Sequence, residues 1–175
     1  MTNKDHEKHN NIFLVGPMGA GKTTIGMQLA KVLDCGFYDS DRVVEEKTGA
    51  GISLVFDLEG EEGFRIRESE AIKELTQLSN IVLATGGGAV LRAENRLHLM
   101  QRGMVVYLEA DVDQLFYRTS KDRNRPLLQT ADPQKKIREI LQQRAPLYKE
   151  VADLIVSTNK QSVKNVVNTI LENKK

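Results

Sequence analysis

The sequence predicts one α/β domain, in which a five-stranded parallel sheet lies between two layers of helices. Two observations predict this fold. Short apolar runs of the β type alternate with longer amphipathic stretches, and the length of 175 residues fits one domain of ordinary size. We therefore expect a doubly wound, three-layer α/β/α domain over residues 1–175, with a disordered polar segment at residues 1–11.

The predicted elements follow one another in the order of a βα repeat. Strands are expected at residues 12–15, 36–38, 81–84, 105–108 and 154–156. Helices are expected at residues 23–33, 41–47, 61–78, 93–101, 111–118, 134–144 and 163–171, and Pro146 is expected to close the sixth of them. In such a sheet, ligands bind beyond the carboxyl ends of the strands, so the residues after each strand are the candidates for chemistry.

Composition excludes several classes of partner. The chain has 25 Lys and Arg against 24 Asp and Glu, for a formal charge of +1, and no run of like charges suggests binding to nucleic acid or to a membrane surface. The single cysteine, Cys35, cannot form an internal disulfide, which suits a reducing compartment. Because no apolar stretch approaches the roughly 18 residues that cross a bilayer, the expected location is the cytoplasm.

The first predicted strand is followed by a phosphate-binding motif. Residues 16–23 read GPMGAGKT and match G-x-x-x-x-G-K-[ST] in full, between a strand and an amphipathic helix. Glycines in this loop let backbone N–H groups point at phosphate oxygens, Lys22 is expected to reach the β and γ phosphates, and Thr23 is expected to bind Mg²⁺. The candidate ATP-binding residues here are Gly19, Ala20, Gly21, Lys22, Thr23 and Thr24.

Other classes of P-loop protein fit the chain less well. Residues 57–60 read DLEG, like the D-x-x-G of GTPases, but they fall in a predicted helix, and Ser162 stands where a guanine-reading Asp would follow Asn159. Adenylate-kinase-like enzymes usually have G-K-G-T in the loop, whereas this chain reads GKTT, with Thr23 in place of the glycine after the lysine.

Two aspartates follow the second predicted strand. Asp39 is the best candidate for a second Mg²⁺ group, acting through water, and Asp41 lies two residues further on. In an extended segment both would face the same side, so Asp41 could serve a substrate hydroxyl as a base or an orienting group. Asp41 could equally be the N-cap of the helix at residues 41–47, and spacing alone does not decide between these hypotheses.

Six segments together resemble the shikimate kinase family in order and spacing. They read GPMGAGKTTIG, FYDSD, EEGFR, VLATGGGAV, RNRPLL and RAPLY. The resemblance implies a monomeric P-loop enzyme of the nucleoside monophosphate kinase type, with a mobile lid at about residues 119–132 and a substrate-binding segment at about residues 40–68. It also implies transfer of the γ-phosphoryl group of ATP, with Mg²⁺, to the 3-hydroxyl of shikimate, in chorismate and aromatic amino-acid biosynthesis.

The same resemblance assigns roles to individual residues. It implies that Asp41 binds the hydroxyls and helps to deprotonate the attacking one, and that Arg65 and Arg144 bind the carboxylate. It also implies that Gly86, Gly87 and Gly88 bring backbone N–H groups to the substrate, that Arg125 in the lid stabilises the phosphates during transfer, and that Arg118 and Gln161 lie against the adenine. Two alternatives remain open: a kinase of another small hydroxy acid such as gluconate, and a nucleotide-binding homologue without catalysis.

Overall fold

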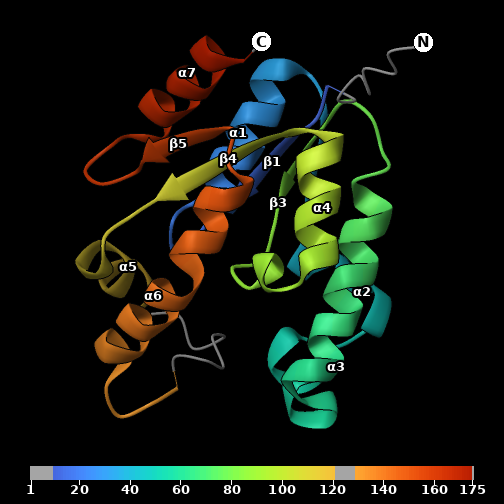
Figure 1. Cartoon of the computed structure of the whole chain (residues 1–175), viewed down its shortest axis with the longest axis vertical. Coiled ribbons are helices and arrows are strands. Elements are labelled where there is room, and N and C mark those ends of the chain that lie inside the picture. Colours follow the sequence, from blue (N-terminus) through green and yellow to red (C-terminus); the bar gives the residue numbers. More distant parts are fainter. Residues whose placement is uncertain (1–9, 121–128, 175) are drawn as a thin grey trace.

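The structure, a computed structural model, describes residues 10–120 and 129–174 (Figure 1). Its five strands form one parallel sheet in the order β2-β3-β1-β4-β5. The strands are β1 (Ile12–Val15), β2 (Gly36–Asp39), β3 (Ile81–Ala84), β4 (Met104–Glu109) and β5 (Leu154–Ser157). The helices are α1 (Lys22–Leu33), α2 (Ser40–Thr48), α3 (Ile52–Leu75), η1 (Ala89–Leu91), α4 (Ala93–Arg102), α5 (Val112–Thr119), α6 (Pro133–Val151) and α7 (Val163–Asn173). The predicted α/β/α fold with a five-stranded parallel sheet is confirmed.

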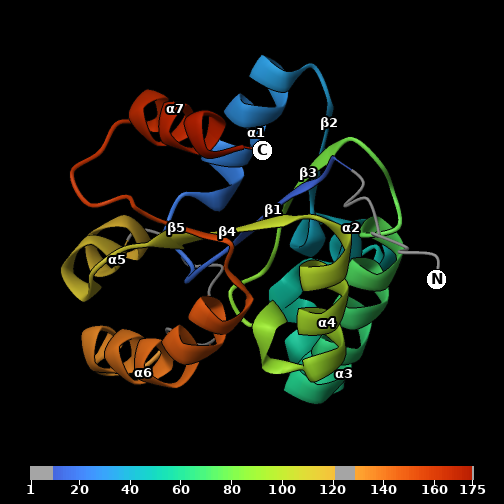
Figure 2. The same ribbon diagram turned by 45° about the horizontal axis from the view of Figure 1, so that its top comes forward.

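Helices cover both faces of the sheet, with α1 and α7 on one face and α3, α4 and α6 on the other (Figure 2). Alternate residues of β1 enter two different cores, as the two-residue period of a strand requires. Ile12 and Leu14 pack in the core under α1 and α7, whereas Phe13 and Val15 pack in the core under α3, α4 and α6. Central strands buried on both faces are typical of parallel sheets.

The sheet changes its direction of winding at β1. This strand pairs with β3 on one side and with β4 on the other, and the backbone N–H of Thr85 continues the β3 pairing with a 3.1 Å hydrogen bond to the carbonyl of Leu14. The chain leaves β1 for α1 on one face and leaves β3 for η1 and α4 on the other. The loops after β1 and β3 therefore meet at the topological switch point, where doubly wound proteins bind their ligands.

Helix α3 begins nine residues earlier than the predicted helix at residues 61–78. It is interrupted at Gly60, whose φ of 72° and ψ of 178° are non-helical, so the predicted start corresponds to a second segment after a break. The additional first segment forms because Val55 is buried with Val44 of α2 and Phe64 of the second segment. The sequence before Gly60 lacks a long run of helical periodicity, so this first segment of α3 was not predicted.

The prediction that Pro146 closes a helix is wrong, because α6 continues through it to Val151. Proline removes one backbone donor and costs about 3 kcal/mol inside a helix. Beyond Pro146, however, Tyr148 and Val151 are almost fully buried against the sheet. Their packing keeps the last turns of α6 helical and extends the face that carries Arg144.

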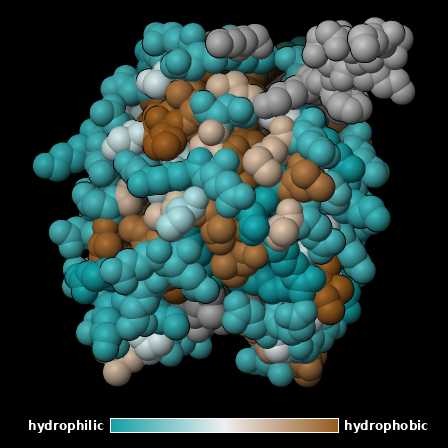
Figure 3. Space-filling view, in the orientation of Figure 1, coloured by the Kyte–Doolittle hydropathy of each residue, from teal (hydrophilic) through white to brown (hydrophobic). Residues whose placement is uncertain are grey.

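The predicted disorder of residues 1–11 does not hold for Asn11, while residues 1–9 lie outside the described part. Asn11 is 2% exposed, and its side-chain amide donates to the carbonyls of Leu78 and Arg102 and accepts from the N–H of Ile81. Within residues 10–120 and 129–174, no helix has the length and hydropathy to cross a membrane. On the face shown in Figure 3, hydrophobic side chains lie in separate small groups among hydrophilic ones.

Candidate active site

The loop between β1 and α1 has the backbone of a phosphate-binding loop. Gly16, Gly19 and Gly21 all have positive φ, at 147°, 86° and 96°, which side chains with a Cβ rarely adopt. The ammonium group of Lys22 donates to the carbonyls of Gly16 (2.6 Å) and Pro17 (2.9 Å), so it is held within the loop. Ala20 is buried and its N–H donates to the Pro17 carbonyl, while Thr24 is exposed on the first turn of α1.

Thr23 and Asp39 lie together at the end of β2. The Thr23 hydroxyl donates to Asp39 Oδ2 across 2.7 Å, and Asp39 Oδ1 accepts the backbone N–H groups of Asp41 and Arg42. Asp39, the last residue of β2, is therefore the N-cap of α2, and the alternative in which Asp41 is that N-cap is wrong. Because Asp41 lies in the first helical turn and Asp39 in the strand, a common extended segment is not what brings the two carboxylates together.

A cavity of about 260 Å³ opens between the phosphate-binding loop, the start of α2 and the loop after β3. Its lining joins residues from four separate parts of the sequence, among them Lys22, Thr23, Asp39, Asp41, Gly86, Gly87 and Arg118. The structure thus brings together, at one edge of the sheet, most of the residues that were predicted to bind the nucleotide, and Asp41, which was predicted to bind the acceptor hydroxyl.

Gly86 is surrounded so closely that no side chain fits there. A Cβ at this position would lie 2.6 Å from Glu68 Oε2 and 2.7 Å from Asp41 Oδ1. The Gly86 N–H donates to the hydroxyl of the buried Ser40 across 3.0 Å. In this structure Gly86 allows two carboxylates to approach the loop, and Ser40 fixes the loop against α2.

Arg65 is a buried cation on α3. It is 7% exposed and its Nη1 bonds Glu68 Oε1 at 2.9 Å, while its Nη2 lies 3.4 Å from the exposed Glu61. Its guanidinium packs directly against Gly88. Glu68 is 1% exposed, and burial raises the pKa of its carboxyl although the Arg65 guanidinium opposes that rise. Arg65 and Glu68 therefore form a buried ion pair beside the glycine loop.

Arg144 is a second buried guanidinium, projecting from α6. It is 3% exposed, and its Nη1 lies 3.6 Å from where a Cβ on Gly87 would be. Burial lowers the pKa of Arg144, and the charge of Arg65 lowers it further. Among residues 10–120 and 129–174, no carboxylate forms an ion pair with Arg144, and Arg65 Nε, Arg144 Nε and Glu68 Oε2 are buried without a hydrogen-bond partner.

Tyr148 lies one turn beyond Arg144 on the same face of α6. It is 1% exposed and its hydroxyl donates to the carbonyl of Gly87 across 2.5 Å. Burial raises the pKa of the Tyr148 hydroxyl, and the nearby positive charge of Arg144 opposes that rise. The ring of Tyr148 packs on that of Tyr107 of β4, with centroids 5.0 Å apart.

Arg118 of α5 binds both the phosphate-binding loop and the end of β5. It donates to the Gly19 carbonyl (3.1 Å) and to the hydroxyl and carbonyl of Thr158 (3.2 and 3.0 Å). Gln161 is exposed in the loop after β5, with its N–H bonded to the Thr158 carbonyl. Thr158 therefore connects the two residues expected near adenine. Arg125 and most of the predicted lid lie outside the described residues.

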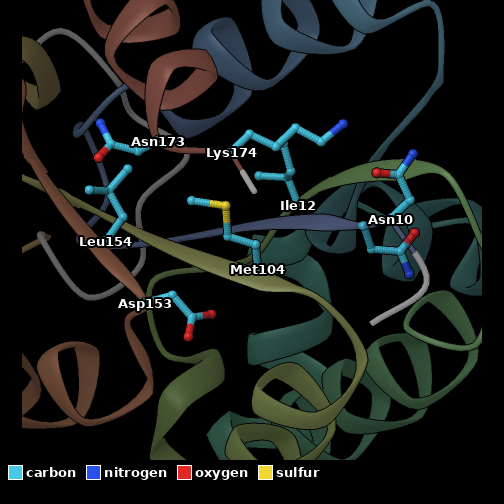
Figure 4. A pocket seen from close by; sticks show the side chains of 8 residues that line it. Asn10, Ile12, Met104, Asp153, Leu154, Asn173 and Lys174 are labelled. Carbon is cyan, nitrogen blue, oxygen red and sulfur yellow. The ribbon is translucent and has the colours of Figure 1, made fainter. Parts of the chain in front are cut away.

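A second cavity of about 560 Å³ lies at the opposite edge of the sheet, where β1, β4 and β5 begin (Figure 4). It is lined by Asn10, Asn11, Ile12, Met104, Asp153, Leu154, Asn173 and Lys174. In the view of Figure 4, Asn173 and Lys174 at the end of α7 and Asp153 before β5 lie on different sides of it. None of the residues that line it belongs to the predicted site.

Three residues that help to build the site had no role predicted from the sequence: Ser40, Glu68 and Tyr148. Each lies inside a segment that was noticed, next to a residue that was singled out: Ser40 between two aspartates, Glu68 three residues after Arg65, and Tyr148 four residues after Arg144. Helical spacing of three or four residues from a candidate arginine was the signal that could have found Glu68 and Tyr148.

The phosphate-binding loop lies at the switch point of a parallel sheet, beside a cavity that the carboxylate of Asp41 lines. This combination is typical of the P-loop kinases of small molecules. The family model described as shikimate kinase matches residues 18–175. The chain belongs to the shikimate kinase family, as the resemblance predicted.

Individual relatives agree with the family model. The shikimate kinase of Nitrosococcus oceani is 60% identical over 161 residues, which cover 92% of this chain and 85% of the relative. That of Haemophilus influenzae is 56% identical over 163 residues, covering 93% and 91%. A solved structure described as shikimate kinase from Acinetobacter baumannii in complex with shikimate has a TM-score of 0.92 and 50% identity, with 98% of this chain and 96% of the other covered.

Proposed function

We propose that this protein transfers the γ-phosphoryl group of ATP to the 3-hydroxyl of shikimate, giving shikimate 3-phosphate and ADP. The observation that carries the proposal is the pair of buried arginines, Arg65 and Arg144: among the described residues one buried carboxylate, Glu68, pairs with Arg65, and no carboxylate pairs with Arg144. A second carboxylate, supplied by the substrate, would balance the second guanidinium. Guanidinium groups bind carboxylates in a bidentate manner, which suits a small acid.

The position of the arginines also fits the reaction. Arg65 packs against Gly88, and Arg144 approaches Gly87, while Asp41 approaches Gly86. A small ring acid held by its carboxylate at the arginines would present its hydroxyls toward Asp41 and the phosphate-binding loop. The substrate would then lie against the glycine loop, Gly86 to Gly88.

Magnesium is part of the proposal, and the residues present fit it. The Thr23 hydroxyl and the Asp39 carboxylate lie 2.7 Å apart beside the loop that would hold the phosphates. Mg²⁺ in nucleotide sites is bound by one or two protein groups together with phosphates and water, so a larger ligand cluster is not required. When bound, the ion would neutralise charge on the β and γ phosphates.

The proposed chemistry is a single in-line displacement. Asp41 accepts the proton of the 3-hydroxyl while the oxygen of that hydroxyl forms a bond to the γ phosphorus. The bond between that phosphorus and the oxygen that bridges the β and γ phosphates breaks, which releases ADP. Lys22 stabilises the charge that develops on the phosphate oxygens. Arg125 of the expected lid, outside the described residues, is proposed to add a second positive charge at the same place.

The test measures ADP formation by the purified protein with Mg·ATP and one acceptor at a time: shikimate, gluconate, AMP or none. We expect strong stimulation by shikimate alone, and loss of that activity when EDTA removes Mg²⁺. Stimulation by gluconate instead would overturn the substrate assignment and keep the kinase. No stimulation by any acceptor would favour a nucleotide-binding homologue without catalysis.

A further inference from the structure

Tyr148 connects the buried guanidinium of Arg144 with the glycine loop after β3. Its hydroxyl donates to the Gly87 carbonyl across 2.5 Å, and the guanidinium of Arg144, one turn earlier on α6, lies 3.6 Å from where a Cβ on Gly87 would be. A tyrosine hydroxyl has one proton to donate and lone pairs that accept, so it can donate to the carbonyl and accept from the guanidinium at once. Arg144 and Tyr148 therefore meet at the same residue of the glycine loop, Gly87.

Gly87 in turn touches the phosphate-binding loop. A Cβ at Gly87 would lie 3.3 Å from the backbone nitrogen of Met18 and 3.6 Å from the carbonyl of Gly16. The peptide that follows Gly87 is planar, so a bond that fixes its carbonyl also fixes the direction of the next N–H group, that of Gly88. The position of Tyr148 is therefore transmitted to both the glycine loop and the edge of the phosphate site.

The surroundings of Tyr148 suit a fixed donor. Its ring is 1% exposed and packs on Tyr107, whose own ring is anchored in β4. Burial raises the pKa of the Tyr148 hydroxyl above its ordinary value, so the group keeps its proton at neutral pH. A hydroxyl that stays protonated can donate to Gly87 throughout the reaction and does not act as a base.

We propose that Tyr148 is a positioning residue for the substrate carboxylate: its hydroxyl fixes the Arg144 guanidinium relative to the Gly87 peptide, and so sets where the acceptor lies relative to the phosphate-binding loop. This role rests on the proposed function, because it requires that Arg144 binds the carboxylate of the acceptor. Misplacement of a bound reactant by about 1 Å can cost a factor of about 100 in rate, so a single hydroxyl at this point is well placed to matter.

Tyr107 provides a matched control. It is the other member of the ring pair, it is equally buried, and it belongs to the same core. Tyr107→Phe removes a hydroxyl from the same pair of rings without removing the bond to Gly87. If Tyr148 served only to fill the core, the two Phe variants would behave alike.

The experiment compares wild type, Tyr148→Phe and Tyr107→Phe by steady-state kinetics and melting temperature. We expect Tyr148→Phe to raise KM for shikimate about tenfold, the size of effect that accompanies loss of a hydrogen bond to a charged group. KM for Mg·ATP should change less than twofold, and Tyr107→Phe should change neither constant by more than twofold. With the methyl ester of shikimate, which lacks the negative charge, the penalty of Tyr148→Phe should shrink.

A double-mutant cycle with Arg144→Lys gives a second, independent readout. Lysine keeps the positive charge but lacks the planar guanidinium that lies beside Tyr148 and Gly87. If Tyr148 acts through Arg144, the two substitutions together should raise KM for shikimate by less than the product of their separate effects. Effects that multiply in full would overturn the proposed connection.

Three further results would also overturn the role of Tyr148: equal KM values for shikimate in the two Phe variants, a parallel rise in both KM values, or an undiminished penalty with the methyl ester. The wild-type arm separates this role from the proposed function. A wild type that forms no ADP with shikimate refutes both, whereas an active wild type with an unaffected Tyr148→Phe variant refutes the positioning role alone.

Discussion

Asp41 and Glu68 are two carboxylates that approach the same glycine, and their surroundings give them different tasks. Glu68 is 1% exposed and paired with Arg65, so it serves to hold a cation in place. Asp41 is only partly buried and lines the cavity beside Lys22 and Thr23. Of the two, Asp41 is the one that can meet both an acceptor hydroxyl and the phosphate site, which is why the proposed mechanism assigns it the proton transfer.

Asp41→Asn should therefore lower kcat by roughly 10²- to 10⁴-fold, the usual contribution of general acid–base catalysis. The amide retains the shape of the side chain, and its oxygen still accepts a hydrogen bond, but it no longer takes up the proton. Affinity for Mg·ATP should stay within about twofold, because the phosphate-binding loop is unchanged. Steady-state kinetics with shikimate, together with nucleotide binding by calorimetry, measure both quantities.

The matched control is Asp57→Asn, the same chemical change at an exposed position of α3. It should leave kcat unchanged. Near-normal turnover in Asp41→Asn would contradict the role of Asp41 as base, and an equal loss in both variants would point to a general effect of the substitution.

At the scale of single residues, the sequence predicted what lies within one motif and missed what depends on contact between segments. Lys22 and Thr23 were singled out from one motif of eight neighbouring residues, and the structure places both in the first turn of α1, directly after the glycine loop. Ser40 bonds Gly86, which is 46 residues away, and Tyr148 bonds Gly87, which is 61 residues away. No local pattern reports such pairs, since only the packing of α2 and α6 on the sheet brings them together.

Helix α3 is divided at Gly60 by a backbone conformation that only glycine adopts readily. Its φ of 72° and ψ of 178° lie in a region essentially reserved for glycine, and no atom lies within 4 Å of a Cβ built there. Gly60→Ala should therefore lower the free energy of unfolding by about 1–3 kcal/mol through backbone strain, with no steric clash to add to it. Urea unfolding followed by circular dichroism measures the change.

Gly51→Ala is the matched control for this prediction. Gly51 precedes the same helix, also has open space around a Cβ, and has an ordinary φ of −67°. Its replacement should change the free energy of unfolding by only a few tenths of a kcal/mol. If both variants lost the same stability, conformational strain at Gly60 would not be the cause.

At the scale of elements, the sequence predicted which strands and helices exist better than where the helices end. All five strands were placed within a residue at each end, because each is a short apolar run. The two large errors concern α3 and α6, in which tertiary contacts outweigh a local signal. Burial of Val55 stabilises the part of α3 before Gly60, which has no long run of helical periodicity in its sequence. Burial of Tyr148 and Val151 keeps α6 helical beyond Pro146.

At the scale of the whole molecule, the winding of the sheet determines which residues meet. The order β2-β3-β1-β4-β5 places the loops after β1 and β3 side by side, and α6 brings Arg144 to them from a distant part of the chain. The rule that ligands bind at such a switch point predicted the edge of the sheet that holds the site. It could not predict that the same packing would bury two tyrosines between β4 and α6.

Those two tyrosines should make the folded molecule sensitive to alkaline pH. Burial raises the pKa of Tyr107 to about 12 and raises that of Tyr148 as well, whereas tyrosines in an unfolded chain ionise near pH 10. Below about pH 10 both states keep these protons, so the two groups contribute no pH dependence there. Between about pH 10 and 12 the unfolded chain releases protons that the native state retains, and the free energy of unfolding must fall as pH rises.

Urea unfolding at pH values from about 9 to 11 should therefore show a decline in stability that is smaller in Tyr107→Phe than in wild type, because phenylalanine has no proton to release. Tyr117→Phe makes the same change at a side chain that is 73% exposed, and its decline should match that of wild type. Equal slopes in all three proteins would mean that the core between β4 and α6 admits hydroxide or opens before it unfolds. A smaller slope in Tyr107→Phe alone would establish that the ring pair behind Arg144 stays closed and protonated until the whole domain unfolds, as a fixed support for the site requires.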